Sequence, residues 1–96
     1  MVKHIILWSF QQGKNTLENK NRIKNSLEEL KKVIPGIVDI KVNINPIEGS
    51  NCDIMLDSTF ENKEALNKYQ VNPEHVKAAE FIKSVLCNRM CFDYEI

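Results

Sequence analysis

The chain has 96 residues, with 13 basic and 13 acidic side chains and no formal net charge. A chain of this length forms a single domain, 1–96, whose own core is thin. No block of one charge sign indicates a nucleic acid or an anionic membrane as a partner, and no apolar run is long enough to cross a bilayer. No signal peptide is recognisable. We therefore expect a cytoplasmic protein that binds neither nucleic acid nor membrane.

Three cysteines are present, Cys52, Cys87 and Cys91. Their odd number and their spacing argue against a disulfide framework and against a structural zinc site. Reduced thiols, packed as small hydrophobic side chains, fit best. The two histidines and the scattered carboxylates show no recognisable ligand spacing, so we predict no metal site built from side chains. Backbone carbonyls around Val33–Ile37 leave open a loop site for a hard cation.

The first half of the chain predicts a strand, a helix and a second strand. Val2–Phe10 carries apolar residues on both faces, which is typical of a strand covered on both sides. Thr16 is a good N-cap for a helix that Pro35-Gly36 ends. Apolar residues recur along this helix at spacings of four, three and four, which gives one buried stripe. The stripe consists of Ile23, Leu27, Leu30 and Ile34.

The second half continues with alternating and helical patterns. The predicted elements are the strands Ile37–Asn45 and Cys52–Phe60, the helices Asn62–Tyr69 and Pro73–Val85, and the strand Arg89–Glu95. Residues 46–51 are turn-forming, so the two middle strands form a hairpin. The order is β-α-β-β-α-β with a split second helical region. It predicts an α+β, ferredoxin-like domain with a four-stranded antiparallel sheet and helices on one face.

The segment Tyr69–Val76 carries the candidate site. Asn72 is a good N-cap and Pro73 suits the first helical position, so His75 lies at about the third. The positive end of the helix dipole disfavours the imidazolium there and favours a neutral, basic ring. Tyr69 lies across a tight connection, where a phenol and an imidazole can exchange protons with a bound molecule. The alternative is a surface histidine beside a packing tyrosine, because most histidines at helix starts have no catalytic role.

The alternation also predicts which strand residues face the helices. The predicted set is His4, Ile6, Trp8, Val38, Ile40, Cys52, Ile54, Met90 and Phe92. His4 would then line the same cavity as His75 and Tyr69, which favours a functional site. A lone histidine on an apolar face is more often a core residue whose nitrogens find partners, and this alternative stays open.

Several segments resemble the stress-responsive A/B barrel (Dabb) family. The most specific are the Y-x-x-x-P-x-H-V element at 69–76 and the early V-K-H at 2–4; Ile34-Pro-Gly36, Asp53–Phe60 and Phe92-Asp-Tyr94 agree in order. The resemblance implies a homodimeric α+β barrel, in which two sheets pack through the faces that the helices leave bare. The interface residues expected on that basis are Ile5, Leu7, Asn43, Met55 and Asp57.

Some plant members of this family are polyketide cyclases. The resemblance implies a site without a cofactor, in which His75 is the acid/base group, Tyr69 holds a carbonyl oxygen and His4 lines the pocket. Positions 23, 24 and 27 are Ile, Lys and Leu instead of large aromatic residues, which argues against closure of a long polyketide. The residues expected to contact a substrate are His4, Ile6, Trp8, Ile23, Leu27, Met90 and Phe92.

Three functions stay open at this point. The first is a cofactor-free lyase, isomerase or cyclase acting on a small carbonyl or aromatic compound. The second is a non-catalytic, stress-responsive dimer that binds a small ligand. The third is a cofactor-independent monooxygenase, which would consume oxygen with an electron-rich phenol.

Overall fold

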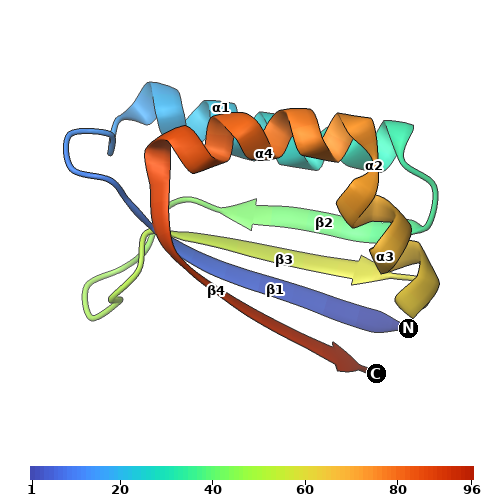
Figure 1. The fold of residues 1–96 in the computed structure, drawn as a ribbon. Coiled ribbons are helices and arrows are strands. Elements are labelled where there is room, and N and C mark those ends of the chain that lie inside the picture. Colours follow the sequence, from blue (N-terminus) through green and yellow to red (C-terminus); the bar gives the residue numbers. More distant parts are fainter.

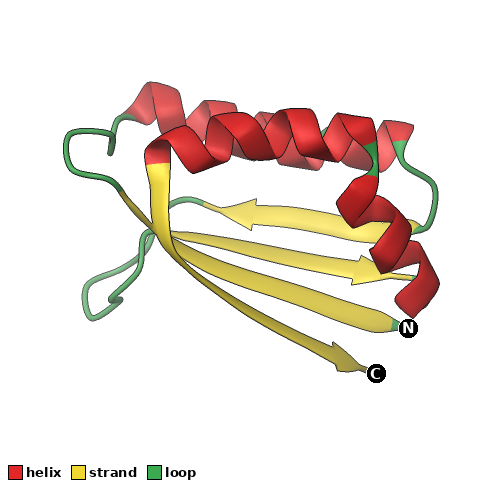
Figure 2. Cartoon of the chain, viewed as in Figure 1, coloured by secondary structure: helices red, strands yellow, loops and turns green.

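The chain folds as the predicted α+β, ferredoxin-like domain, and the computed structural model describes all residues 1–96. Its elements are β1 (Val2–Phe10), α1 (Leu17–Glu28), α2 (Leu30–Val33), β2 (Ile37–Asn43), β3 (Ile54–Phe60), α3 (Lys63–Val71), α4 (Pro73–Val85) and β4 (Leu86–Glu95). Figure 1 shows α1, α2 and α4 lying across one face of the sheet, with α3 at the end where the two termini meet. The other face is bare of helices, as the colouring by element type in Figure 2 makes plain.

The four strands are antiparallel and lie in the order β2-β3-β1-β4. β1 is therefore a central strand, paired with β3 on one side and with β4 on the other. Alternate residues of β1, Val2, His4, Ile6 and Trp8, are buried beneath the helices, as predicted. This placement puts the only histidine of the sheet inside the core.

The helical stripe predicted from spacing is buried in full. Ile23 and Leu27 come from α1, Leu30 begins α2, and Ile34 follows it. The chain then turns at Gly36, which has a φ of +91°. A Cβ added at Gly36 would lie only 2.7 Å from the Cβ of Ala65 on α3. Both the backbone conformation and the close approach of α3 therefore require glycine at this turn.

The prediction that Met90 and Phe92 face the helices is wrong. The register pairs Phe92 with Ile5 and Met90 with Leu7, on the bare face of the sheet. Met90 and Phe92 are 69% and 68% exposed. Alternation defines two sets of residues but does not say which set turns inward, and here the pairing with β1 decides it.

Two smaller predictions about burial also fail. Val38 is 40% exposed, because the register shifts between Ile37 and Asp39 and a bulge turns the intervening residue away from the helices. On α4, Val76 is 44% exposed and Ala78 is buried in its place. The buried stripe of α4 runs through Ala78, Ile82 and Val85, and at 3.6 residues per turn Val76 lies on nearly the opposite side of the helix.

The bare face of the sheet mixes apolar and charged side chains. Ile5, Leu7 and Met55 are half-buried there, beside the exposed side chains of β4. Lys3 forms an ion pair with Asp57 at 2.5 Å on the same face. None of the helices combines the length and the apolar character needed to span a membrane.

Candidate functional site

The junction between α3 and α4 positions the candidate acid/base pair. Tyr69 lies in the last turn of α3 and is 1% exposed, and its backbone carbonyl accepts the N–H of Asn72 at 3.2 Å. The side chain of Asn72 accepts the N–H of Glu74 at 2.9 Å and caps α4, which begins at Pro73 as predicted. The sharp turn brings the rings of Tyr69 and His75 to a centroid distance of 4.3 Å.

The hydrogen bonding of His75 defines which ring nitrogen is free. Its Nδ1 lies 3.2 Å from the backbone carbonyl oxygen of Gln70. A carbonyl oxygen only accepts hydrogen bonds, so Nδ1 carries the hydrogen. In the neutral ring, Nε2 then has a free lone pair. His75 thus has the tautomer that a general base needs.

The surroundings of His75 keep its ring neutral. Burial is the largest cause and lowers the pKa of His75 below its ordinary value. The hydrogen bond to Gln70 opposes this shift, whereas the positive fields of His4, Arg89 and Lys83 reinforce it. The direction agrees with the sequence prediction of a neutral histidine, although the prediction named the helix dipole as the cause. A neutral imidazole is available as a base at neutral pH.

Tyr69 is also held in its neutral form, as the protonated phenol. Burial raises the pKa of its phenol above the ordinary value, so the hydroxyl keeps its proton. The ring packs against Phe60 at a centroid distance of 4.8 Å and meets the edge of His4 at 6.3 Å. Tyr69 is therefore a rigid hydrogen-bond donor next to a base.

Tyr69 and His75 line one small cavity beneath the helices, with a volume of about 70 Å³. The other lining residues are Ile6, Trp8, Leu27, Leu56, Ala79, Ile82, Lys83 and Arg89. An apolar cavity that admits benzene has about twice this volume, ~150 Å³. The cavity as it stands has room for a molecule of only a few heavy atoms.

The structure brings together only part of the predicted site. Ile6, Trp8 and Leu27 line the cavity as expected, whereas Ile23 and His4 are buried beside it and do not line it. The expected set also omitted two cations on the cavity wall. Arg89 comes from β4, and only the fold reveals that this strand passes next to α4.

His4 lies under Tyr69 and has polar partners of its own. Its Nδ1 is 2.5 Å from Oδ1 of Asp93 and 3.7 Å from Sγ of Cys91. The prediction of small buried cysteines fails for Cys91, which is exposed on β4. Beside the start of α3, the carbonyl of Gly36 accepts the N–H of Glu61 at 3.0 Å, and a hard-cation site around Val33–Ile37 stays a prediction.

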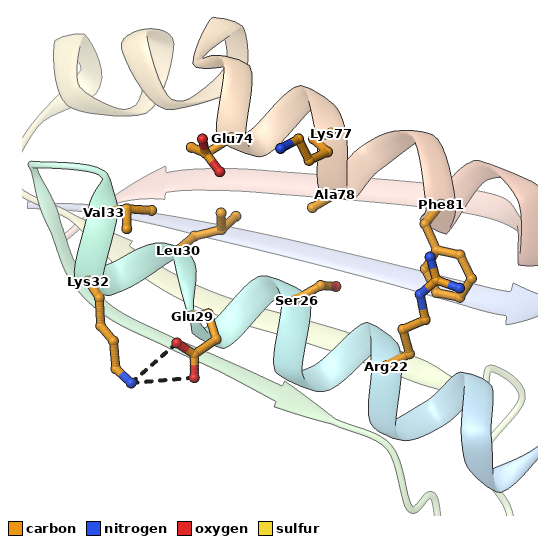
Figure 3. A pocket seen from close by; sticks show the side chains of 10 residues that line it. All are labelled: Arg22, Ser26, Glu29, Leu30, Lys32, Val33, Glu74, Lys77, Ala78 and Phe81. Atoms are coloured by element: carbon orange, nitrogen blue, oxygen red, sulfur yellow. Dashed lines mark hydrogen bonds and ion pairs between the residues drawn. The ribbon is translucent and has the colours of Figure 1, made fainter.

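A larger hollow lies between α1, α2 and α4, and Figure 3 shows the side chains around it. Its volume is about 380 Å³, and charges of both signs surround it. Glu29 and Lys32 form an ion pair at 3.2 Å, and the guanidinium of Arg22 stacks on the ring of Phe81 at 3.7 Å. The lining of this hollow contains no histidine, so we place the candidate acid/base site in the smaller cavity.

Comparisons with known proteins agree with this fold and place the chain in a family. Its sequence is 28% identical to the stress-response A/B barrel domain-containing protein HS1 of Arabidopsis thaliana, over 98% of this chain and 88% of that protein. A crystal structure from Bacteroides fragilis, a dimeric protein of unknown function with a ferredoxin-like fold, is 33% identical, with a TM-score of 0.90 and coverage of 99% of this chain and 95% of that chain.

A hydroxynitrile lyase from Passiflora edulis shares the fold alone, at 14% identity, with a TM-score of 0.85 and coverage of 99% of this chain and 92% of that chain. The family model described as the stress responsive A/B barrel domain matches residues 2–96. That match extends over nearly the whole chain and includes every strand and helix of the sheet-and-helix layers. The protein therefore belongs to the stress responsive A/B barrel domain family.

Proposed function

We propose that the protein is a small, cofactor-free acid/base catalyst, a lyase or isomerase of a short carbonyl compound. The observation that supports this most directly is the pairing of His75 and Tyr69 on one cavity wall, with ring centroids 4.3 Å apart. Burial favours the neutral imidazole in one residue and the neutral phenol in the other. A base beside a hydrogen-bond donor is the minimal equipment for enolisation.

In the proposed step, Nε2 of His75 removes a proton from the carbon next to the carbonyl group. The C–H electron pair moves into the new C=C bond, and the carbonyl π electrons move onto oxygen. The hydroxyl of Tyr69 donates a hydrogen bond to that enolate oxygen. Lys83 and Arg89 on the cavity wall stabilise its negative charge. Return of the proton to another carbon completes an isomerisation, and loss of a leaving group from the enolate completes a lyase reaction.

The cavity supports a restriction on substrate size. At about 70 Å³ it accepts a short ketone, aldehyde or hydroxy-carbonyl compound more readily than a polycyclic one. Leu27 and Trp8 also line the cavity, and their apolar side chains offer a substrate no further hydrogen-bond acceptors. This agrees with the small aliphatic residues of the first helix, which argued against a long polyketide.

Deuterium exchange tests this proposal without knowledge of the natural substrate. Acetylacetone or a short ketone is incubated with the protein in D₂O, and loss of the α-proton signal is followed by NMR. We expect His75→Ala to lower the exchange rate by about 10²- to 10⁴-fold. Glu74→Gln, an exposed change in the same helical turn, is the matched control and should leave the rate unchanged. Exchange no faster than with free imidazole, or an unchanged rate in His75→Ala, would refute the proposal.

The small volume of the cavity favours a second candidate, a non-catalytic protein that binds a small ligand. In that case His75 and Tyr69 orient the ligand and do not move its protons. The same samples separate the two functions, because this candidate predicts saturable binding of a short carbonyl compound without exchange. Oxygen consumption with an electron-rich phenol, measured in parallel, would instead support the monooxygenase alternative.

We also propose that two copies pair through the bare face of the sheet. Relatives of this fold are described as dimeric, including the Bacteroides fragilis protein. The face carries the five residues expected at the interface, Ile5, Leu7, Asn43, Met55 and Asp57. Met90 and Phe92 extend its apolar area, which suits a buried contact better than an exposed one. Phe92→Asp should convert a dimer to a monomer in light scattering, and a monomeric wild-type protein would contradict the proposal.

A further inference from the structure

We propose a second site in this protein, a binding site for a divalent transition-metal ion of the zinc and cobalt class, formed by His4, Cys91 and Asp93. One donor atom from each residue lies within 4.8 Å of the other two. The site is separate from the cavity of His75, and it stands or fails independently of the proposed catalysis.

The sheet itself brings the three side chains together. Cys91 and Asp93 are two residues apart on β4, so they point to the same face. The register pairs Asp93 with His4 and Cys91 with Ile6 on β1. The three donors therefore rest on two hydrogen-bonded strands, which hold their backbones fixed. Elements of regular structure position metal ligands more accurately than loops do.

The distances between the donor atoms are close to those of a tetrahedral site. Sγ of Cys91 lies 3.3 Å from Oδ1 of Asp93 and 3.7 Å from Nδ1 of His4. Ligands bound to Zn²⁺ at about 2.0–2.3 Å in tetrahedral geometry are roughly 3.3–3.7 Å apart. The third distance, 2.5 Å between His4 and Asp93, must lengthen by nearly 1 Å. Rotation of the partly exposed Asp93 side chain achieves this without moving a strand.

The chemistry of the donors selects the kind of ion. Imidazole nitrogen and thiolate sulfur favour borderline and soft divalent ions over Mg²⁺ or Ca²⁺. Cys91 binds such an ion as the thiolate, and its proton passes to solvent when the metal–sulfur bond forms.

One ligand of the proposed site is buried and ordered, and the other two are accessible to solvent. His4 is 2% exposed and its ring is fixed by aromatic contacts with Phe60 and Tyr69. Cys91 and Asp93 face solvent at the edge strand, where an ion can enter and where water completes the fourth position. Lys63 acts on Asp93 and Arg89 acts on Cys91 with positive fields that oppose the binding of a cation. Both are exposed side chains that can turn away into solvent, whereas His4 is buried and held in place.

The sequence did not suggest this site because its ligands do not form a local motif. Cys91 and Asp93 show only the spacing of two that any strand contains, and His4 is 87 residues away from Cys91. Only the pairing of the first strand with the last makes them neighbours. The expectation that the chain has no side-chain metal site is the one that this proposal replaces.

Cobalt is the probe for the test, because thiolate coordination to Co²⁺ gives a near-ultraviolet charge-transfer band. We expect the reduced full-length protein to bind one Co²⁺ per chain with this band, and Zn²⁺ to displace it. Cys91→Ser should abolish the band, and Asp93→Asn should weaken affinity by about 10- to 100-fold. Cys87→Ser and Cys52→Ser are the matched controls and should leave the band unchanged.

The two histidines provide a second readout. Addition of Zn²⁺ should shift the imidazole proton signals of His4 in the NMR spectrum and leave those of His75 in place. The proposal is overturned if the wild-type protein gives no thiolate band, if the band survives in Cys91→Ser, or if His75 is the histidine that shifts. Circular dichroism of each variant establishes that an exposed substitution on β4 has left the fold intact.

Discussion

The two histidines of this chain occupy opposite kinds of surroundings. His4 is in the middle of a strand, 2% exposed, and its Nδ1 faces a carboxylate and a thiol. His75 is in the first turn of a helix, half-buried, and its Nδ1 faces a backbone carbonyl. The partner of Nδ1 decides what each ring can do. The carboxylate and the thiol beside His4 are groups of the kind that bind metal ions, whereas the carbonyl partner leaves Nε2 of His75 free as a base.

Tyr69 lies between the two histidines and belongs to both environments. Its ring meets His75 at 4.3 Å and His4 at 6.3 Å. The sheet therefore supports the cavity indirectly: His4 packs under Tyr69, and Tyr69 packs beside His75. Substitutions at His4 should therefore act mainly on the free energy of unfolding. Substitutions at His75 and at the Tyr69 hydroxyl should act mainly on the rate of the exchange reaction.

After His75→Ala, the largest effect is expected from Tyr69→Phe on the exchange reaction. The change removes the hydroxyl proposed to bind the enolate and keeps the ring that packs against Phe60. Loss of one such donor typically lowers a rate by about 10²- to 10³-fold. The free energy of unfolding should change by less than about 1 kcal/mol, since the packing is retained. NMR exchange rates and urea unfolding of the same sample measure both, and an unchanged rate would remove Tyr69 from the chemistry.

Alanine substitutions at the two histidines should separate stability from function. His4→Ala leaves a void in the core and takes away the partner of Asp93, so we expect it to cost about 2–4 kcal/mol of unfolding free energy. His75→Ala truncates a half-buried side chain at a helix start and should cost less than about 1 kcal/mol. Urea denaturation, analysed as a two-state transition, measures the difference. Equal losses of unfolding free energy in both variants would mean that His4 is no more important for stability than His75.

The sequence predicted the architecture and the proximity of Tyr69 and His75 more successfully than it predicted the walls of the cavity. Thr16, Asn72 and Gly36 act through local backbone geometry, which a sequence pattern records directly. The inward set of β4 was assigned wrongly, because Met90 and Phe92 are as apolar as core residues although they lie on the bare face. Which face a strand turns inward depends on its pairing with a distant strand, and that information is not local.

The smallest expected effect concerns the pH dependence of stability, and it distinguishes the two sites by their pH range. The pKa of His75 is lowered from 6.5, so the unfolded chain binds the proton more tightly than the folded protein does. The stability associated with His75 is therefore complete above pH 6.5 and is lost as the pH falls through the lower folded value. Asp93 acts in the same direction in stronger acid: burial would raise its pKa, but the hydrogen bond and charge of His4 lower it from 3.8.

A plot of the free energy of unfolding against pH should therefore show two separate losses of stability in the acid range. His75→Asn should flatten this plot at and below pH 6.5, and Asp93→Asn should flatten it only at and below pH 3.8. Glu74→Gln controls for the loss of an acidic or basic group at an exposed position of α4. If His75→Asn left the slope below pH 6.5 unchanged, the ring would have the same proton affinity in the folded and unfolded chains. It would then lack the buried, neutral state on which its role as a base depends.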